Sequence, residues 1–147
     1  LKNYSLLYEN IYLTDSTDFL SNFDDLEKDE IRKFYLRKKN PKYVDPTSIA
    51  LMSAGIPGLG KIVLGEYSDG ITAFIMTGLM VFLAIDNFNA DHQFRGWLFT
   101  GLATMFYAGN IYGSYAAAQI YNAGIKFNFE NDLQIYIQEQ NYFSPKY

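Results

Sequence analysis

The sequence predicts an all-α membrane protein: a helical hairpin head, then a broken or re-entrant segment, then a two-helix transmembrane hairpin. Two observations lead to this fold class. Residues 1–45 hold 8 of the 12 Lys and Arg and 9 of the 16 Asp and Glu. The following stretch is nearly free of charge, and uncharged runs of about 18 or more apolar residues are typical of membrane spans. We therefore expect a polar helical head at residues 1–45, a membrane domain at 46–125 and a polar, aromatic tail at 126–147.

The head is predicted to form two antiparallel helices. Apolar residues recur at helical spacing over residues 1–13 and again from about Asp18 to Lys39, with capping side chains at residues 14–18 between them. In the second helix the acidic residues come before the basic ones, which is the order that the helix dipole favours.

Six basic residues end the head, next to the first uncharged run: Arg32, Lys33, Arg37, Lys38, Lys39 and Lys42. Asn40-Pro41 and Asp45-Pro46 end the helix and mark the boundary of the head. The six bases are candidates for contact with anionic lipid headgroups, where each is worth about 1 kcal/mol. A solvated helix end is the alternative, and the sequence leaves both interpretations open.

The first uncharged run, residues 46–60, is not expected to form a straight helix. Pro57 removes a hydrogen-bond donor, and three glycines lie within three residues of it. We expect a short helix to about Ser53, a turn, and a further element at 61–65. Backbone of this kind at membrane depth must be covered by protein or line a wet cavity. A phosphate-binding loop is the alternative, but it requires Ser or Thr where residue 62 is Ile.

The second uncharged run becomes long enough to span a bilayer when it is extended from Tyr67 to Phe88, with aromatic residues at both interfaces. Asp69 is expected to cap its N-terminus. Asp86 lies at the C-terminal end, where the helix dipole disfavours a carboxylate. We therefore expect Asp86 to pair with Arg95 across a loop of nine residues.

The third uncharged run is 30 residues long and contains small residues at four-residue spacing. We expect Gly109, Gly113 and Ala117 to form the closest helix–helix contact, with Asn110 and Ser114 available for hydrogen bonds beside it. The partner is either the chain's own preceding helix or another subunit. The candidate packing and interaction residues of the membrane domain are Pro57, Gly58, Gly60, Gly109, Asn110, Gly113, Ser114 and Ala117.

Two periodicities compete in the tail. Leu133, Ile135 and Ile137 alternate as in a strand, whereas Leu133, Tyr136 and Ile137 fit the spacing of a helix. The sequence leaves the secondary structure of the tail open.

Several motifs of the membrane domain resemble those of a known group of proteins. The segment P-G-L-G-K-I at residues 57–62, with Gly65 and Asp69-Gly70 after it, is similar to the pattern P-G-x-G-x-x-[YF]-x-G-x-x-x-[DK]-G of small bacterial two-transmembrane-helix proteins. The segment G-N-I-Y-G-S at residues 109–114 strengthens the resemblance. Together they resemble membrane proteins associated with YidD-type membrane-protein insertion factors. The resemblance implies a membrane hairpin in the bacterial inner (cytoplasmic) membrane and an association with protein insertion or secretion.

Composition excludes several function classes. The chain has no Cys and one His, which excludes disulfides, thiolate zinc sites and histidine-rich metal sites. A net charge of −4 argues against a nucleic-acid partner. The sequence shows no convincing pair of nucleophile and base, so we expect no enzymatic activity, no cofactor and no metal.

The expected function is therefore that of a non-enzymatic integral membrane subunit, accessory to a protein insertion or secretion complex or needed for its assembly. Its partners would be the lipid bilayer and other membrane-protein subunits. One alternative is a soluble or peripheral helical interaction domain. Another is a small-cation-binding membrane protein that uses Asp86, Asp91 and His92 in the 86–95 loop.

Overall fold

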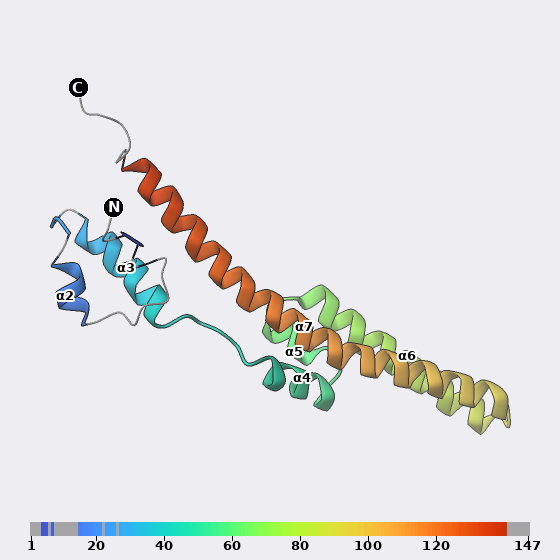
Figure 1. Ribbon diagram of the computed structural model, residues 1–147. Coiled ribbons are helices and arrows are strands. Elements are labelled where there is room, and N and C mark those ends of the chain that lie inside the picture. Colours follow the sequence, from blue (N-terminus) through green and yellow to red (C-terminus); the bar gives the residue numbers. More distant parts are fainter. Residues whose placement is uncertain (1–3, 6, 8–14, 22, 26, 141–147) are drawn as a thin grey trace. The chain divides into compact units, whose positions relative to one another are not determined.

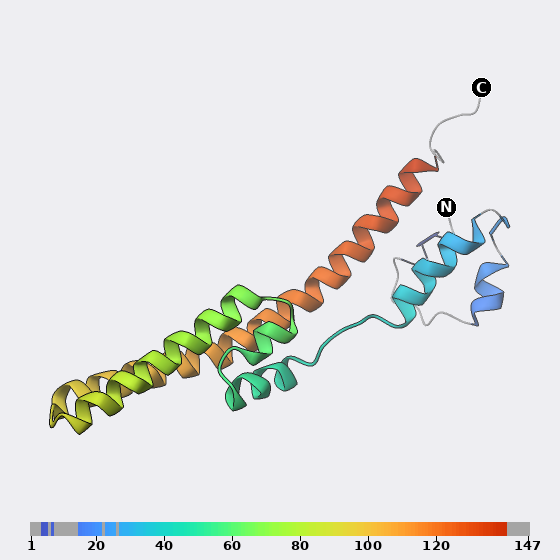
Figure 2. The same cartoon turned by 180° about the vertical axis from the view of Figure 1, so that it is seen from behind.

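The computed structural model describes residues 4–5, 7, 15–21, 23–25 and 27–140, and all regular structure in these ranges is helical. The all-α prediction is thus confirmed for this part of the chain. The helices are α2 (Ser16–Leu20), α3 (Lys28–Lys39), α4 (Pro46–Gly55), α5 (Leu59–Val63), α6 (Tyr67–Asn89) and α7 (Gln93–Glu139) (Figures 1 and 2).

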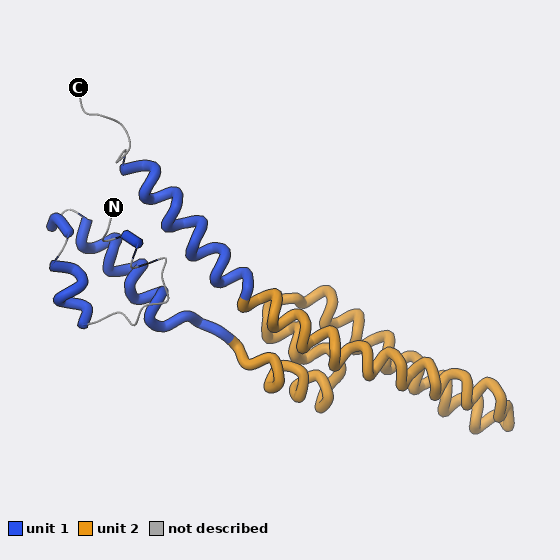
Figure 3. The backbone as a smooth tube through the Cα atoms, in the orientation of Figure 1, with its two compact units in different colours: residues 1–43, 123–147 blue, residues 44–122 orange. Residues whose placement is uncertain are grey.

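The chain divides into two compact units (Figure 3). Unit 1 consists of Leu1–Tyr43 together with Ala123–Tyr147, and unit 2 consists of Val44–Asn122. The long helix α7 contributes its first part to unit 2 and its second part to unit 1. The head and the tail therefore belong to one unit, although about 80 residues of sequence separate them.

In unit 1, the prediction of one continuous helix over residues 18–39 is wrong. The helix α2 ends at Leu20 and α3 begins at Lys28. A turn separates them, in which the carbonyl of Asp24 accepts from the backbone N–H groups of Glu27 and Lys28. Ser and Asp residues compete with the helical backbone for hydrogen bonds, and the hydroxyl of Ser21 donates to the carbonyl of Asp18. Most of the helix expected at residues 1–13 lies outside the described residues.

Aromatic and aliphatic side chains from head and tail form the core of unit 1. Its buried members are Tyr4, Leu7, Phe19, Phe23, Ile31, Phe34, Tyr35, Phe129 and Leu133. Phe129 and Leu133 come from α7, and Tyr136 and Ile137 pack against the same cluster. The tail is helical up to Glu139. Its helical spacing places Leu133, Tyr136 and Ile137 on the core side and leaves Ile135 exposed.

Replacing Leu133 by Ala should lower the free energy of unfolding by about 2–5 kcal/mol, because this side chain is fully buried and its removal leaves a cavity. The matched control is Ile135→Ala on the same helix, where the side chain is 45% exposed and a change of about 0.5 kcal/mol is expected. Denaturant unfolding followed by circular dichroism measures both. Equal losses from the two variants would contradict the assignment of the core face.

In unit 2, the expected break at the glycine-rich segment is present. Helix α4 begins with Pro46 in its first turn and ends at Gly55, and α5 begins at Leu59. Asp45 caps α4, since its carboxylate accepts from the backbone N–H groups of Thr47 and Ser48 at 3.3 and 2.8 Å and from the hydroxyl of Ser48 at 2.7 Å. These hydrogen bonds from Ser48 lower the pKa of Asp45 below its ordinary value of 3.8.

Acid is expected to weaken the start of α4. A carboxyl group whose pKa is lower in the folded state stabilises that state above its unfolded pKa, and the stabilisation is lost as the pH falls through the folded pKa. Amide hydrogen exchange at Thr47 and Ser48 should therefore accelerate below about pH 4, relative to amides in the middle of α6. In Asp45→Asn, which retains a capping oxygen, the exchange should not show this acid-dependent step. A step that persists in this variant would assign it to another group.

The helices α6 and α7 form an antiparallel hairpin (Figures 1 and 2). The ring of Phe88 fills the space beside Gly96, where a Cβ atom would lie 2.6 Å from the ring, and it meets the ring of Trp97 edge-on at 5.5 Å. Only Ala90, Asp91 and His92 separate the two helices, with Asp91 in the left-handed region at φ 58°. The close packing at this turn explains why the connection is shorter than expected.

Two expectations about charged residues of the hairpin are wrong. Asp86 and Arg95 are both exposed, and none of the ion pairs between described residues joins them. The reason is that α6 continues to Asn89, so both residues lie on helices rather than at the ends of a flexible loop. Asp69 does not cap α6, because the helix already begins at Tyr67. Asp69 lies in the first turn and forms an ion pair with Lys61 instead.

Candidate functional site

A backbone contact between two glycines organises unit 2. Gly58 lies in the left-handed region at φ 86°, and a Cβ atom on it would lie 1.9 Å from the carbonyl oxygen of Gly70. A Cβ atom on Gly70 would in turn lie 2.7 Å from the carbonyl oxygen of Gly58 and 2.5 Å from the side chain of Ile62. The turn before α5 therefore packs directly on the first turns of α6, which only two glycines allow.

A second close contact fixes α5 on α4. A Cβ atom on Gly60 would lie 2.2 Å from the carbonyl oxygen of Ile49 and 2.7 Å from the hydroxyl of Ser53. The backbone N–H of Gly60 donates to that hydroxyl at 2.9 Å. The glycine thus permits both the close approach and the hydrogen bond that it makes there.

Two buried serines extend this contact to α7. The hydroxyls of Ser53 and Ser114 lie 2.7 Å apart, and the hydroxyl of Ser114 donates to the carbonyl of Asn110 at 2.9 Å. Each hydroxyl has one proton, so Ser53 must donate to Ser114. The chain of donors runs from the N–H of Gly60 through Ser53 and Ser114 to Asn110, and it satisfies two hydroxyls that are fully buried.

Gly58→Ala should destabilise the protein more than Gly65→Ala does. Both glycines have a positive φ, 86° and 89°, and therefore carry the same conformational strain of about 1–2 kcal/mol when replaced. A Cβ atom at Gly65 meets nothing within 4 Å, whereas one at Gly58 meets the backbone of Gly70. The difference between the two melting temperatures isolates the backbone contact, and equal melting temperatures would show that the contact is dispensable.

The small-residue pattern of α7 has a different role from the one expected. Nothing lies within 4 Å of a Cβ atom built on Gly109, and the only neighbour of one on Gly113 is the side chain of Lys61, at 3.5 Å or more. Within this chain, Gly109 and Gly113 therefore do not form the closest helix–helix contact, and a contact of this surface with another subunit stays a prediction. The tight backbone contacts of unit 2 lie instead at Gly58, Gly60 and Gly70, where the turn before α5 packs on α6 and α5 packs on α4.

The remaining interaction residues of the membrane domain lie inside unit 2. Asn110, Ser114 and Ala117 are buried on α7, and Pro57 is half-buried in the turn between α4 and α5. Sequence analysis did not single out Ser53, although a serine within an otherwise apolar helix is a usable signal. It also missed Asn122, whose side-chain amide pairs with both the N–H and the carbonyl of Val44 at 2.9 and 2.8 Å.

The six basic residues proposed for lipid headgroups do not form one free patch. Arg37 pairs with Asp132 at 2.9 Å and lies over the rings of Phe34 and Phe129. Lys33 pairs with Glu30, and the ammonium groups of Lys38 and Lys39 lie near the rings of Phe129 and Tyr35. Arg32 and Lys42 are exposed. Five of the six residues are nevertheless exposed, and Lys38 is half-buried.

The expected cation ligands are not gathered. Asp86, Asp91 and His92 are all exposed, and within the described part of the chain no three His, Asp or Glu side chains are placed to hold a metal ion. The backbone N–H of His92 donates to the carbonyl of Asn87, which is an ordinary helix-end hydrogen bond.

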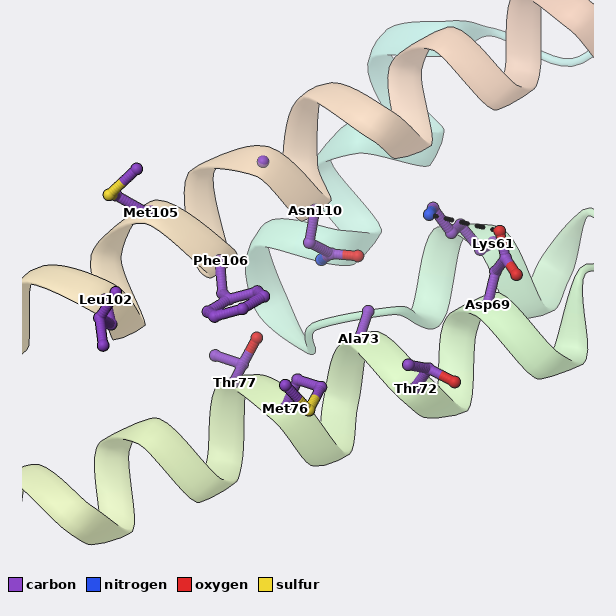
Figure 4. Close-up of a pocket in the computed structure, with 11 residues that line it drawn as sticks. Lys61, Asp69, Thr72, Ala73, Met76, Thr77, Leu102, Met105, Phe106 and Asn110 are labelled. Carbon is purple, nitrogen blue, oxygen red and sulfur yellow. Dashed lines mark ion pairs between the residues drawn. The ribbon is translucent and has the colours of Figure 1, made fainter. Parts of the chain in front are cut away.

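A groove between α6 and α7 combines charged, polar and apolar side chains (Figure 4). It has a volume of about 590 Å³, which lies within the range of small-molecule sites. The ion pair of Lys61 and Asp69 lies at one end, with Nζ and Oδ2 3.9 Å apart, and Asn110 lies near the middle. The apolar walls are formed by Ala73, Met76, Leu102, Met105 and Phe106.

Comparison of the chain with models of protein families, with curated proteins and with solved structures finds no match. The site is therefore interpreted from its own residues.

Proposed function

We propose that this chain is a non-enzymatic integral membrane protein that spans the bilayer twice, through α6 and the first part of α7. The observation that carries the proposal is the exposure of α6. Within the described residues, it is the one helix that is long and apolar enough to cross a membrane, and only 11% of its apolar window is buried. A core helix of a soluble protein would be mostly buried, and a protein in water rarely exposes so large an apolar surface.

The start of α7 supports a second span. Its first part exposes large apolar side chains, among them Phe94, Trp97, Leu98, Met105 and Phe106, and residues 96–125 carry no charge. A helix of 47 residues is about 70 Å long, more than twice the hydrocarbon thickness. Trp97 near the turn and Tyr67 at the other end of α6 are exposed where interfacial aromatic residues are favoured.

The segment α4–turn–α5 fits a shallow, re-entrant position. Leu51, Met52 and Ile56 expose apolar side chains there. The turn packs on α6 through Gly58 and Gly70, and the N–H of Gly60 is satisfied by Ser53. The short non-helical turn of this segment thus packs on protein at Gly58, and contact with protein is a condition for such backbone at membrane depth.

The role within the membrane is that of an accessory or assembly subunit. An extended hairpin with exposed apolar faces offers surfaces to other membrane proteins. Its resemblance to proteins associated with insertion factors makes a protein insertion or secretion complex of the bacterial cytoplasmic membrane the proposed partner. Co-purification from mild detergent tests this role. A chain that always purifies alone, and whose deletion leaves insertion and secretion unchanged, would refute it.

Topology can be tested with single cysteines, since the chain has none of its own. We expect Ser21→Cys and Asn128→Cys to react from the cytoplasmic side and Asn89→Cys from the opposite side. This places Arg32–Lys42, Lys61 and Lys126 inside and Arg95 outside, as the positive-inside rule requires. A membrane-impermeant maleimide added to intact and to permeabilised cells makes the measurement.

Two outcomes would contradict the two-span topology. Labelling of residues 21 and 128 from opposite sides would mean an odd number of crossings. Labelling of all three positions from the cytoplasmic side, with the protein released by high salt, would favour the peripheral interaction domain. That alternative is supported by unit 1, which has a core of its own.

A further inference from the structure

Three buried polar atoms of residues that line the groove have no hydrogen-bond partner. They are Nδ2 and Oδ1 of Asn110 on α7 and Oγ1 of Thr77 on α6. Each residue is 6% exposed. Figure 4 shows the side chain of Asn110 pointing from α7 toward α6 into the groove. A buried polar atom without a partner costs about 1–3 kcal/mol, so a ligand that pairs with both atoms of the Asn110 amide would stabilise the protein.

Other buried polar groups of unit 2 do have hydrogen-bond partners, so the unpaired atoms are particular to the groove. Ser53 and Ser114 satisfy each other and the backbone around them. The side-chain amide of Asn122, on the same helix as Asn110, has both atoms paired with the N–H and the carbonyl of Val44. A ligand that pairs with Asn110 in the same way offers a donor to Oδ1 and, beside it, an acceptor to Nδ2.

Water alone does not account for the groove. One or two waters could satisfy the three polar atoms, but they would not pack against the walls formed by Met76, Leu102, Met105 and Phe106. A volume of about 590 Å³ far exceeds what those waters need. The occupant must therefore carry an apolar part as well as a polar one.

A cation lies at the other end of the groove. The side chain of Lys61 is 19% exposed and runs past Gly113, where a Cβ atom would lie 3.5 Å from its Cε. Its ammonium group lies 3.9 Å from Asp69, which is beyond hydrogen-bond distance. Asp69 is 68% exposed. The ammonium therefore has donors left for an anion, and Asp69 is the group that an anion would replace.

Along the groove, the charged pair of Lys61 and Asp69 is followed by the unpaired amide of Asn110 and then by a mainly apolar part that also contains Thr77 (Figure 4). We propose that this groove binds one single-chain anionic amphiphile, of the class of monoacyl glycerophospholipids. The phosphate lies at Lys61, the free hydroxyl donates to Oδ1 of Asn110, and the ester carbonyl accepts from Nδ2. The acyl chain lies along Met76, Leu102 and Phe106.

The unpaired Oδ1 is what selects the monoacyl lipid. A diacyl glycerophospholipid offers only acceptors at its ester linkages, so it leaves Oδ1 without a donor. The monoacyl lipid has a free hydroxyl at that place, beside the ester carbonyl. Its single chain also suits a groove of this volume.

Binding can be measured on the full chain transferred from detergent into an amphipathic polymer, so that no detergent monomers compete. The probe is monomyristoyl phosphatidylglycerol, and the readouts are native mass spectrometry and the melting temperature. We expect one lipid per chain and a melting temperature that rises with lipid concentration. The measurement does not depend on topology, so its failure is distinguishable from failure of the two-span proposal.

Four variants test the assigned contacts. Asn110→Leu and Lys61→Met should each weaken binding by about tenfold or more. Asn110→Leu should also raise the melting temperature of the lipid-free protein, because it removes two unpaired buried atoms. Asp69→Asn should strengthen binding, since it removes the carboxylate that competes for Lys61. Gln119→Leu, the same change on an exposed position of α7, is the control and should have no effect.

Three further ligands distinguish a lipid headgroup from a free phosphate compound as the source of the bound phosphate. Glycerol 3-phosphate lacks the chain and monomyristoylglycerol lacks the charge, so both should bind more weakly than the complete lipid. Dimyristoyl phosphatidylglycerol should also bind more weakly. The proposal is overturned if the monoacyl lipid does not bind, if the diacyl lipid binds equally well, or if Asn110→Leu binds as tightly as the unaltered chain. Saturable binding of glycerol 3-phosphate alone, equal in strength, would instead define a phosphate site.

Discussion

The contact between the backbones of Gly58 and Gly70 is the constraint on which the arrangement of unit 2 depends. It brings the turn before α5 against the start of α6, at a distance that excludes any Cβ atom. Because α5 is held there, Gly60 can reach α4 and donate to Ser53, which in turn donates to Ser114 on α7. Four helices are therefore fixed relative to one another by one backbone contact and one chain of buried hydrogen bonds.

Unit 1 is held together by a different kind of interaction. Its core is a cluster of aromatic and aliphatic side chains, in which Phe34 and Phe129 meet edge-on at 6.1 Å and Arg37 lies over both rings. Hydrophobic burial is non-directional, so this unit tolerates a break between α2 and α3. Unit 2 depends instead on close backbone contacts at glycines and on directional hydrogen bonds of buried serines.

The unpaired side chain of Asn110 marks the groove as a candidate ligand site. The buried Ser53 and Ser114 and the side-chain amide of Asn122 all have hydrogen-bond partners. The unpaired amide of Asn110 and the hydroxyl of Thr77 are therefore departures from the rule that buried polar groups have partners. Such departures lower stability and are therefore expected at sites that serve a ligand. The apolar walls around them and the ammonium of Lys61 give the groove a polarity that matches an amphiphile.

The sequence by itself determined the helical class, the break at Pro57, the order of charge along α3, and the separation of a charged head from an uncharged stretch. These follow from local properties: hydrophobic period, proline geometry and the helix dipole. Only the tertiary structure decided that Gly58 meets Gly70, that Ser53 pairs with Ser114, and that Leu133 joins the core of the head. Each of these depends on where distant segments meet, because a small or polar residue in the sequence does not identify its partner. For that reason the sequence placed the closest contact at Gly109, Gly113 and Ala117, whereas in the structure the side chain of Lys61 lies beside Gly113 and nothing lies within 4 Å of a Cβ atom on Gly109.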